Sequence, residues 1–256
     1  MSVDFRARHS LSSIFSDGHE PVWSPPVRLR HKTLPGWFPT SKAPQQKIRY
    51  RAPLMADGLM HIDTDPQVRR ISPYPLSLVF GVMDESGNLK KREQTPDLAV
   101  LKKDGSVVFI DFVPYQIRQA NSFYEDRELN LREFCRDVYD SAYTVLDERH
   151  IHAQPLFDNI KTLWAHRAVA QSNVPLAKLR QLLRFVQMPV TLGTLLREVK
   201  LGQQHQAFDE ILRPQRDRSL TFSGVMQLVI LGELEIDLDR PFSETSVVRR
   251  VAGGGR

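Results

Sequence analysis

Two apolar runs joined by a tight turn constrain the fold more than any other part of this sequence. Residues 97–102 (DLAVLK) and 107–113 (VVFIDFV) are rich in aliphatic and aromatic side chains, and Asp104-Gly105 lies between them. An Asp-Gly pair supplies the positive backbone φ angles that a short hairpin turn needs. We therefore predict that the two runs form an antiparallel β-hairpin.

The second run carries a carboxylate among apolar residues. Alternation along a strand places Val107, Phe109, Asp111 and Val113 on one face. An isolated buried charge is costly, so Asp111 should be paired, protonated or metal-bound. Asp97, at the start of the first run, is the expected neighbour, and Mg²⁺ or Mn²⁺ between the two acids would relieve their repulsion. The alternative is that Asp97 caps a turn while Asp111 faces solvent.

Further elements between residues 46 and 155 alternate between strand and helix patterns and predict an α/β domain. They are a strand at 76–83, a turn at 84–88, a helix at 123–142, a strand at 142–147 and then a turn or short helix. The apolar stripe of the predicted helix consists of Phe123, Leu129, Leu131, Phe134, Val138 and Tyr139.

The two ends of the chain have different patterns. Residues 1–45 are rich in proline with little apolar periodicity, which predicts an extended, basic arm or a set of ordered loops without a packed element. A linker helix is expected within 156–175. Residues 176–250 then predict a small winged-helix domain, with helices at 176–186, 191–200 and 205–213, and a fourth from 222 with Gly232 as its C-cap before a strand.

Bulk composition excludes several classes of protein. The chain of 256 residues has 41% hydrophobic and 25% charged residues, as in ordinary soluble proteins, and no apolar run approaches the roughly 20 residues of a membrane span. The N-terminal segment does not have the pattern of a secretory signal. The single Cys135 rules out an internal disulfide framework and a cysteine-based zinc site. A cytoplasmic location is the expectation.

The charge balance is modestly basic, with a net charge of +5. Residues 27–51 contain several Lys and Arg and no Asp or Glu, so this segment is either a solvated basic arm or a surface that contacts nucleic-acid phosphates. Other chemistry has little support in the sequence. We expect His150 and His152 to be ordinary surface residues and Cys135 to be a packing thiol, and no glycine-rich phosphate loop is present.

Four blocks of sequence occur in an order that is typical of a known family. They are GWFPTSK (36–42), IDTDPQVRRISPYP (62–75), TPDLAVLKKDGSVVFIDFVPY (95–115) and YTVLDERHIHAQPLFDNIKTLW (143–164). Together they resemble successive blocks of the TnsA endonucleases, which are subunits of heteromeric bacterial transposases. The tail after residue 175 is similar to the helical, winged-helix part of that family.

The resemblance implies a restriction-endonuclease-like core, that is, a mixed sheet flanked by helices. It also implies metal-dependent cleavage of the 5′ strands at transposon ends, while a DDE-type partner subunit joins the 3′ ends. Asp97 matches the aspartate of the family's Pro-Asp pair, and Asp111 matches its Glu/Gln position. These two are the expected catalytic residues and ligands of Mg²⁺ or Mn²⁺.

Two positions depart from the family's pattern. The lysine position is occupied by Val113, which can neither orient a water molecule nor stabilise charge on a phosphate. The helix acid is replaced by Leu54 or Met55, and Asp57 would need a register shift to take its place. Lys102, Lys103 and Arg118 are other cations that would have to reach the site from elsewhere.

The remaining predictions concern partners. Lys42, Lys47, Arg49 and Arg51 are the expected contacts to double-stranded DNA. A helix-turn-helix after residue 190 would carry Asp209 and Glu210, which suit phosphates poorly. In the resembled family this region contacts the partner transposase or an AAA+ regulator, so assembly is favoured there over sequence reading.

Three functional hypotheses follow from these features. The first is a TnsA-like transposition protein that cleaves DNA. The second is a pseudonuclease that binds DNA and organises the transposase complex without cleavage. The third is an unrelated DNA-binding regulator that uses a winged helix.

Overall fold

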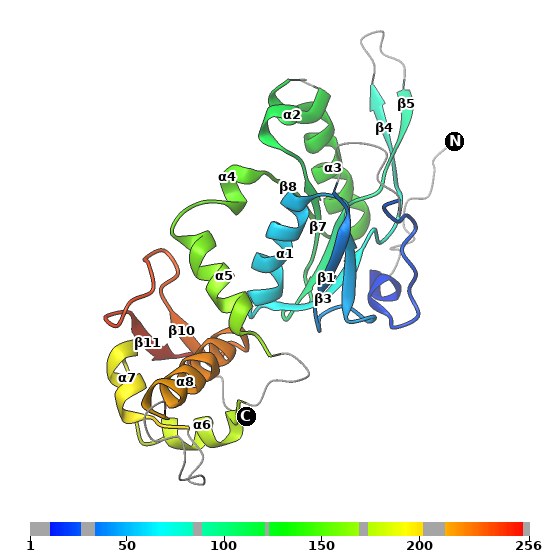
Figure 1. Cartoon of the computed structure of the whole chain (residues 1–256). Coiled ribbons are helices and arrows are strands. Elements are labelled where there is room, and N and C mark those ends of the chain that lie inside the picture. Colours follow the sequence, from blue (N-terminus) through cyan, green and yellow to red (C-terminus); the bar gives the residue numbers. More distant parts are fainter. Residues whose placement is uncertain are drawn as a thin grey trace. The chain divides into compact units, whose positions relative to one another are not determined.

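The computed structural model describes residues 11–26, 34–83, 89–120, 123–168, 174–201 and 213–252 (Figure 1). The chain divides into two compact units, one of residues 1–63 and 67–151 and the other of residues 64–66 and 152–256. The predicted turn at 84–88 and almost all of the predicted helix at 205–213, with Asp209 and Glu210, lie outside the described residues. None of the described helices is long and apolar enough to cross a membrane.

A four-stranded mixed sheet forms the centre of the first unit, with strand order β3-β6-β7-β8. Its strands are β3 (Val68–Pro73), β6 (Leu98–Lys102), β7 (Val107–Phe112) and β8 (Ala142–Leu146). The first three are antiparallel neighbours, whereas β7 and β8 are parallel. A parallel pair needs a crossover connection, and α3 (Phe123–Tyr139) lies in the segment that provides it. The predicted mixed α/β architecture is therefore present.

The first unit contains further helices and strands. They are the 3₁₀ helix η1 (Leu11–Phe15), the hairpin of β1 (Gly36–Pro39) and β2 (Lys47–Tyr50), helix α1 (Pro53–Thr64), the ribbon of β4 (Leu78–Met83) and β5 (Leu89–Gln94), and helices α2 (Tyr115–Gln119) and α4 (Glu148–Ile151).

The predicted hairpin is confirmed by β6 and β7. Leu98 pairs with Ile110, and the turn contains Gly105 with a φ of 86°. A positive φ of this kind is open to glycine at no steric cost, so the Asp-Gly signal located the turn correctly.

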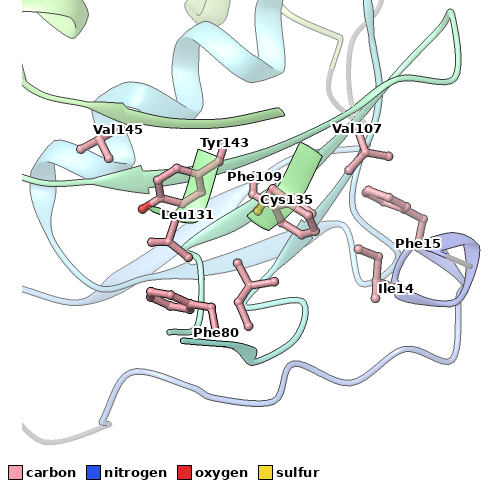
Figure 2. Close-up of a cluster of buried hydrophobic side chains, with 11 residues drawn as sticks. Ile14, Phe15, Phe80, Val107, Phe109, Leu131, Cys135, Tyr143 and Val145 are labelled. Carbon is pink, nitrogen blue, oxygen red and sulfur yellow. The ribbon is translucent and has the colours of Figure 1, made fainter. Parts of the chain in front are cut away.

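The hydrophobic core of the first unit lies between α3 and one face of the sheet (Figure 2). Phe109 and Tyr143 extend from the sheet toward Leu131 and Cys135 of α3. The predicted alternation of β7 holds, because Val107 and Phe109 are buried in this cluster and Val113 packs against it. Cys135 is a buried free thiol, as its packing role predicts.

The N-terminal segment contributes to this core, contrary to the prediction that it holds no packed element. Ile14 and Phe15 of η1 are buried in the same cluster as Val107. Arg70 of β3 fastens the segment by donating to the carbonyl of Phe15 at 3.0 Å and to Asp17 at 2.6 Å. The two adjacent apolar side chains pack against the same face of the sheet as Val107. A pair of apolar residues is too short to show a helix or strand periodicity in the sequence.

One member of the predicted stripe on α3 is wrong. Leu129 is 58% exposed, whereas the neighbouring Glu128 is buried and accepts hydrogen bonds from Arg118 and Arg132. Leu131 and Cys135, one turn apart, set the buried face of the helix. Leu129 is two residues from Leu131, about 200° around the helix, so it faces away. The side chain of Phe123 lies outside the described part of the chain.

The second unit consists of helices and a small antiparallel sheet of order β10-β11-β9. Its elements are α5 (Leu156–His166), α6 (Leu176–Leu183), β9 (Val190–Thr191), α7 (Leu192–Glu198), α8 (Arg213–Ile230), β10 (Leu234–Ile236) and β11 (Val247–Arg250). Helix α5, in the region predicted as a linker helix, packs against α8, and its Asn159 donates to the carbonyls of Leu238 and Arg240.

The predicted C-cap of α8 is confirmed. Gly232 has a φ of 76° and donates its N–H to the carbonyl of Val229 at 2.9 Å, while Glu233 donates to the carbonyl of Leu228 at 2.9 Å. This pair of bonds satisfies the last carbonyls of the helix in the Schellman arrangement.

The other face of the sheet is covered by α1 at a close contact. A Cβ added to Gly58 of α1 would overlap the ring of Phe112 on β7, and that ring is buried. We expect Gly58→Ala to destabilise the first unit by about 1–3 kcal/mol, because the locked aromatic ring cannot move aside. Urea unfolding of the full chain measures this effect.

Gly18→Ala is the matched control, because nothing lies within 4 Å of a Cβ added at that position. Its effect should stay within about 0.5 kcal/mol. Equal stabilities of the two variants would contradict the packing of α1 against Phe112.

Candidate functional site

Asp97 and Asp111 lie directly across the β6–β7 hairpin from each other. Asp97 precedes β6 by one residue, and the pairing of Leu98 with Ile110 sets it opposite Asp111. Each carboxylate accepts a backbone hydrogen bond from the other strand, Asp111 from the N–H of Asp97 at 2.9 Å and Asp97 from the N–H of Phe112 at 2.8 Å. Both acids are almost fully buried, at 3% and 2% exposure. The two carboxylates therefore share one site, as the sequence predicts.

Arg51 neutralises the first acid through a two-pronged ion pair. Its Nε donates to one oxygen of Asp97 at 2.5 Å, and its Nη2 donates to the other at 2.8 Å. The same Nη2 donates to the carbonyl of Phe112 at 2.7 Å. A planar guanidinium fits a carboxylate in this bidentate geometry, which gives strong, directional pairing.

The second acid is held by polar side chains from three elements. One oxygen of Asp111 accepts from Gln94 of β5 at 2.8 Å and from the hydroxyl of Tyr143 of β8 at 2.6 Å. Arg127 of α3 lies at 3.5 Å from the same oxygen. Together with the N–H of Asp97, these groups fill nearly all the acceptor positions of the carboxylate.

The pKa values of the site follow from burial and from the two charges. Burial, and then the negative charge of Asp97, raise the pKa of Asp111 to about 6, against the lowering effect of its bond from Tyr143. Burial alone would lower the pKa of Arg51, but its hydrogen bond to Asp97 and the charges of Asp97 and Asp111 outweigh burial and raise it. Arg51 therefore remains a cation at any physiological pH.

The residues present do not fit a divalent metal in this arrangement. Mg²⁺ needs a near-octahedral shell of oxygen ligands. Here the oxygens of Asp97 and Asp111 already accept bonds from protein donors, and Arg51 supplies the positive charge that a metal would bring. Within the described residues, no group of three or more His, Cys, Asp or Glu is placed to hold a metal ion.

The positions that depart from the nuclease pattern contribute no catalytic group. Val113 packs against the core cluster of the first unit. Met55 is fully buried, with its sulfur 3.5 Å from the hydroxyl of Tyr74, and Leu54 and Asp57 lie half-buried on α1.

The contacts described for the cations considered as replacements for the missing lysine do not include Asp97 or Asp111. Lys103 is exposed in the β6–β7 turn, where its N–H donates to the carbonyl of Gln67, and Lys102 is half-buried at the end of β6. Arg118 bridges Asp147 and Glu128 at 2.8 and 2.7 Å. His150 also contacts Asp147, at 2.8 Å, while His152 stacks on Phe157.

The four candidate DNA contacts have different environments. Arg51 belongs to the acid site described above, and Lys42 donates to the carbonyl of Ile62 in α1 at 3.1 Å. Lys47 and Arg49 of β2 both lie over the ring of Trp37, with the Lys47 Nζ 4.8 Å and the Arg49 guanidinium carbon 5.4 Å from the ring centroid.

Sequence reasoning missed Gln94, Arg127 and Tyr143, and it assigned Arg51 a different role. For two of the missed residues, the sequence pattern indicated which face of a strand or helix they occupy. Tyr143 alternates with Val145 on the core face of β8, and Arg127 precedes Leu131 by one helical turn on α3. Gln94 and Arg51 had no such signal, since each reaches the site only through the tertiary fold.

No protein-family model matches the sequence, and no curated protein matches it significantly.

Removal of the arginine should convert the acid pair into a cation site. We expect Arg51→Gln to destabilise the first unit by about 3 kcal/mol, because it leaves two buried carboxylates without their main counter-charge. Mg²⁺ or Mn²⁺ should then raise the melting temperature of the variant and leave that of the unaltered chain unchanged. Differential scanning calorimetry with and without the metal measures both effects.

Arg180→Gln is the matched control, because Arg180 makes the same bidentate contact with Glu233 at an exposed position. That variant should lose much less stability and gain nothing from metal. Metal stabilisation of the unaltered chain would show that the guanidinium does not exclude cations.

The raised pKa of Asp111 predicts a pH dependence of stability. In the unfolded chain this carboxyl titrates near about 3.9, so between about pH 4 and pH 6 the folded state holds a proton that the unfolded state has lost. The contribution of Asp111 to stability is thus full below about pH 4 and falls as pH rises to about 6. The stability of the unaltered chain relative to Asp111→Asn should decline by about 2–3 kcal/mol over this interval. Urea titrations at a series of pH values measure the decline, and a constant difference would contradict it.

Proposed function

We propose that this chain is a TnsA-like transposition protein that binds transposon-end DNA within a multi-subunit transposase and does not cleave it. It acts as a pseudonuclease, with a DDE-type transposase subunit and an AAA+ regulator as its partners. The observation that carries this proposal is the acid pair Asp97 and Asp111 on adjacent strands of a mixed sheet, closed by the bidentate contact of Arg51.

The position of the acid pair supports the nuclease-like origin. The Pro-Asp aspartate lies opposite the second acid on the next strand, beside a parallel strand reached through α3. A mixed sheet with α1 on one face and α3 on the other is compatible with a restriction-endonuclease-like core.

The chemistry of the site supports binding over cleavage. Hydrolysis of a phosphodiester needs an activated water and a cation that stabilises charge on the phosphate. Val113 stands where the family's lysine would be, and the Nε and Nη2 atoms of Arg51 are engaged by Asp97 and the carbonyl of Phe112. The rival function, metal-dependent cleavage of the 5′ strand, requires Arg51 to leave Asp97.

The second unit supports a role in assembly or DNA contact. Its elements run helix, short strand, two helices and two strands from α6 to β11, and β11 lies between β10 and β9. This order is compatible with a winged helix, in which a helix pair is followed by a β-ribbon. We assign this unit to docking of the transposase or its regulator.

Binding and cleavage can be measured on the same DNA. A duplex with the terminal sequence of the encoding element should bind the full chain, and affinity should fall steeply between about 50 and 200 mM salt. No nick should appear with Mg²⁺ or Mn²⁺. Asp97→Asn should leave binding unchanged, because Asp97 is buried.

Each contrary result points to a different rival. Nicking that disappears in Asp97→Asn would establish the active nuclease. Equal binding of a scrambled duplex, with no DDE-type transposase encoded beside the gene, would favour the winged-helix regulator.

A further inference from the structure

A cavity of about 270 Å³ lies in the first unit, and neither Asp97 nor Asp111 lines it. Its walls are formed by the N-terminal segment around Glu20, by the β1–β2 hairpin and by the end of β3 with Tyr74. Ligand pockets of proteins commonly span roughly 300–1,000 Å³, so this cavity suits one small, flat group. No part of the acid site accounts for it.

The cavity presents an aromatic ring beside two cations. Trp37 is 53% exposed, although large aromatic residues are usually buried well. Lys47 and Arg49 lie over the same ring on the neighbouring strand. Arg49 is fixed in place, because it donates to the carbonyls of Pro25 and Pro26, at 2.9 Å each. An exposed ring flanked by positioned cations is the combination that binds single-stranded nucleic acid, through base stacking and phosphate pairing.

The remaining walls provide polar groups. Glu20 is exposed at the cavity and can accept from the exocyclic amino group of a base, as a carboxylate does from cytosine. His19 also lines the cavity, and its Nε2 is buried without a hydrogen-bond partner among the described residues.

Tyr74 connects the cavity to the acid pair. It lines the cavity, and its N–H donates to the carbonyl of Asp97 at 3.0 Å. Its φ of 46° is rare for a residue with a bulky side chain, and such strain is concentrated at functional sites. Trp23 packs edge-on against the Tyr74 ring at 4.7 Å. The cavity and the nuclease-like site are therefore neighbours on one unit.

We propose that this cavity binds a single unpaired nucleotide of a DNA strand. The base stacks on Trp37, Lys47 and Arg49 pair with the adjoining phosphates, and Glu20 favours a base with an exocyclic amino group. This assignment rests on the proposed DNA-binding function, and it adds recognition of an unpaired end or gap. A free nucleotide has the same chemistry, so the test separates the two sources.

The experiment compares three labelled DNAs by fluorescence anisotropy: a fully paired duplex, the same duplex with a short single-stranded cytosine tail, and the tailed duplex with abasic tail positions. The full chain should bind the cytosine tail about tenfold more tightly than the abasic tail, because stacking needs the base. Trp37→Ala should remove this difference and leave affinity for the paired duplex unchanged. Trp37→Phe should retain most of it.

Charge and base selectivity have their own controls. Lys47→Gln should weaken binding of both tailed DNAs, whereas Lys103→Gln removes another exposed lysine, in the β6–β7 turn, and should not. Glu20→Gln should reduce the preference for a cytosine tail over a thymine tail. Circular dichroism of each variant confirms that the fold is retained.

The contrary outcomes are distinct. Equal affinity of the full chain for cytosine and abasic tails overturns the cavity assignment alone, provided that the paired duplex still binds. Binding of no DNA overturns the proposed function as well. Free deoxycytidine monophosphate that binds as tightly as the tailed duplex would show that the cavity is a mononucleotide site and would overturn the strand assignment.

Discussion

The contact of Arg51 with Asp97 joins the start of α1 to the β6–β7 hairpin that carries the acid pair. Buried carboxylates on adjacent strands would repel each other strongly, and a buried ion pair is favourable only when its remaining hydrogen-bonding groups are satisfied. That condition is met, since Asp97 accepts from Arg51 and from the N–H of Phe112, and Arg51 also reaches the carbonyl of Phe112. Because Arg51 lies two residues before α1, the same contact ties the start of that helix to the middle of the sheet.

In the proposed pseudonuclease, the acid pair serves the structure and not the chemistry. A catalytic metal centre keeps open ligand positions and leaves part of its charge uncompensated until the metal arrives. Here the guanidinium of Arg51 pairs with Asp97, and one oxygen of Asp111 accepts from both Gln94 and Tyr143. The pKa of Asp111 is raised first by burial and then by the negative charge of Asp97, so the repulsion between the two acids persists beside the arginine.

Local sequence patterns predicted the parts of this structure that local physics determines. The Asp-Gly turn, the alternation along β7 and the glycine cap of α8 each depend on a few neighbouring residues. The role of Arg51 could not be found in this way, because Arg51 and Asp97 are separated by 46 positions and meet only after the sheet forms. The exposed Leu129 shows the same limit, since tertiary packing of Leu131 fixed the phase of α3.

Because Arg51 pairs with Asp97, the basic segment of residues 27–51 must be interpreted differently from the sequence prediction. Of the cations expected to contact DNA, Arg51 is engaged by an internal acid and Lys42 donates to a helix carbonyl, so neither has its charge directed at a duplex in this arrangement. Lys47 and Arg49 instead accompany an exposed tryptophan. Cations without an aromatic surface bind the phosphates of any duplex. Cations beside an exposed aromatic ring favour single-stranded DNA, because an unpaired base can stack on the ring. The proposed nucleotide-binding cavity therefore adds to this segment an expected preference for unpaired bases beside the acid pair.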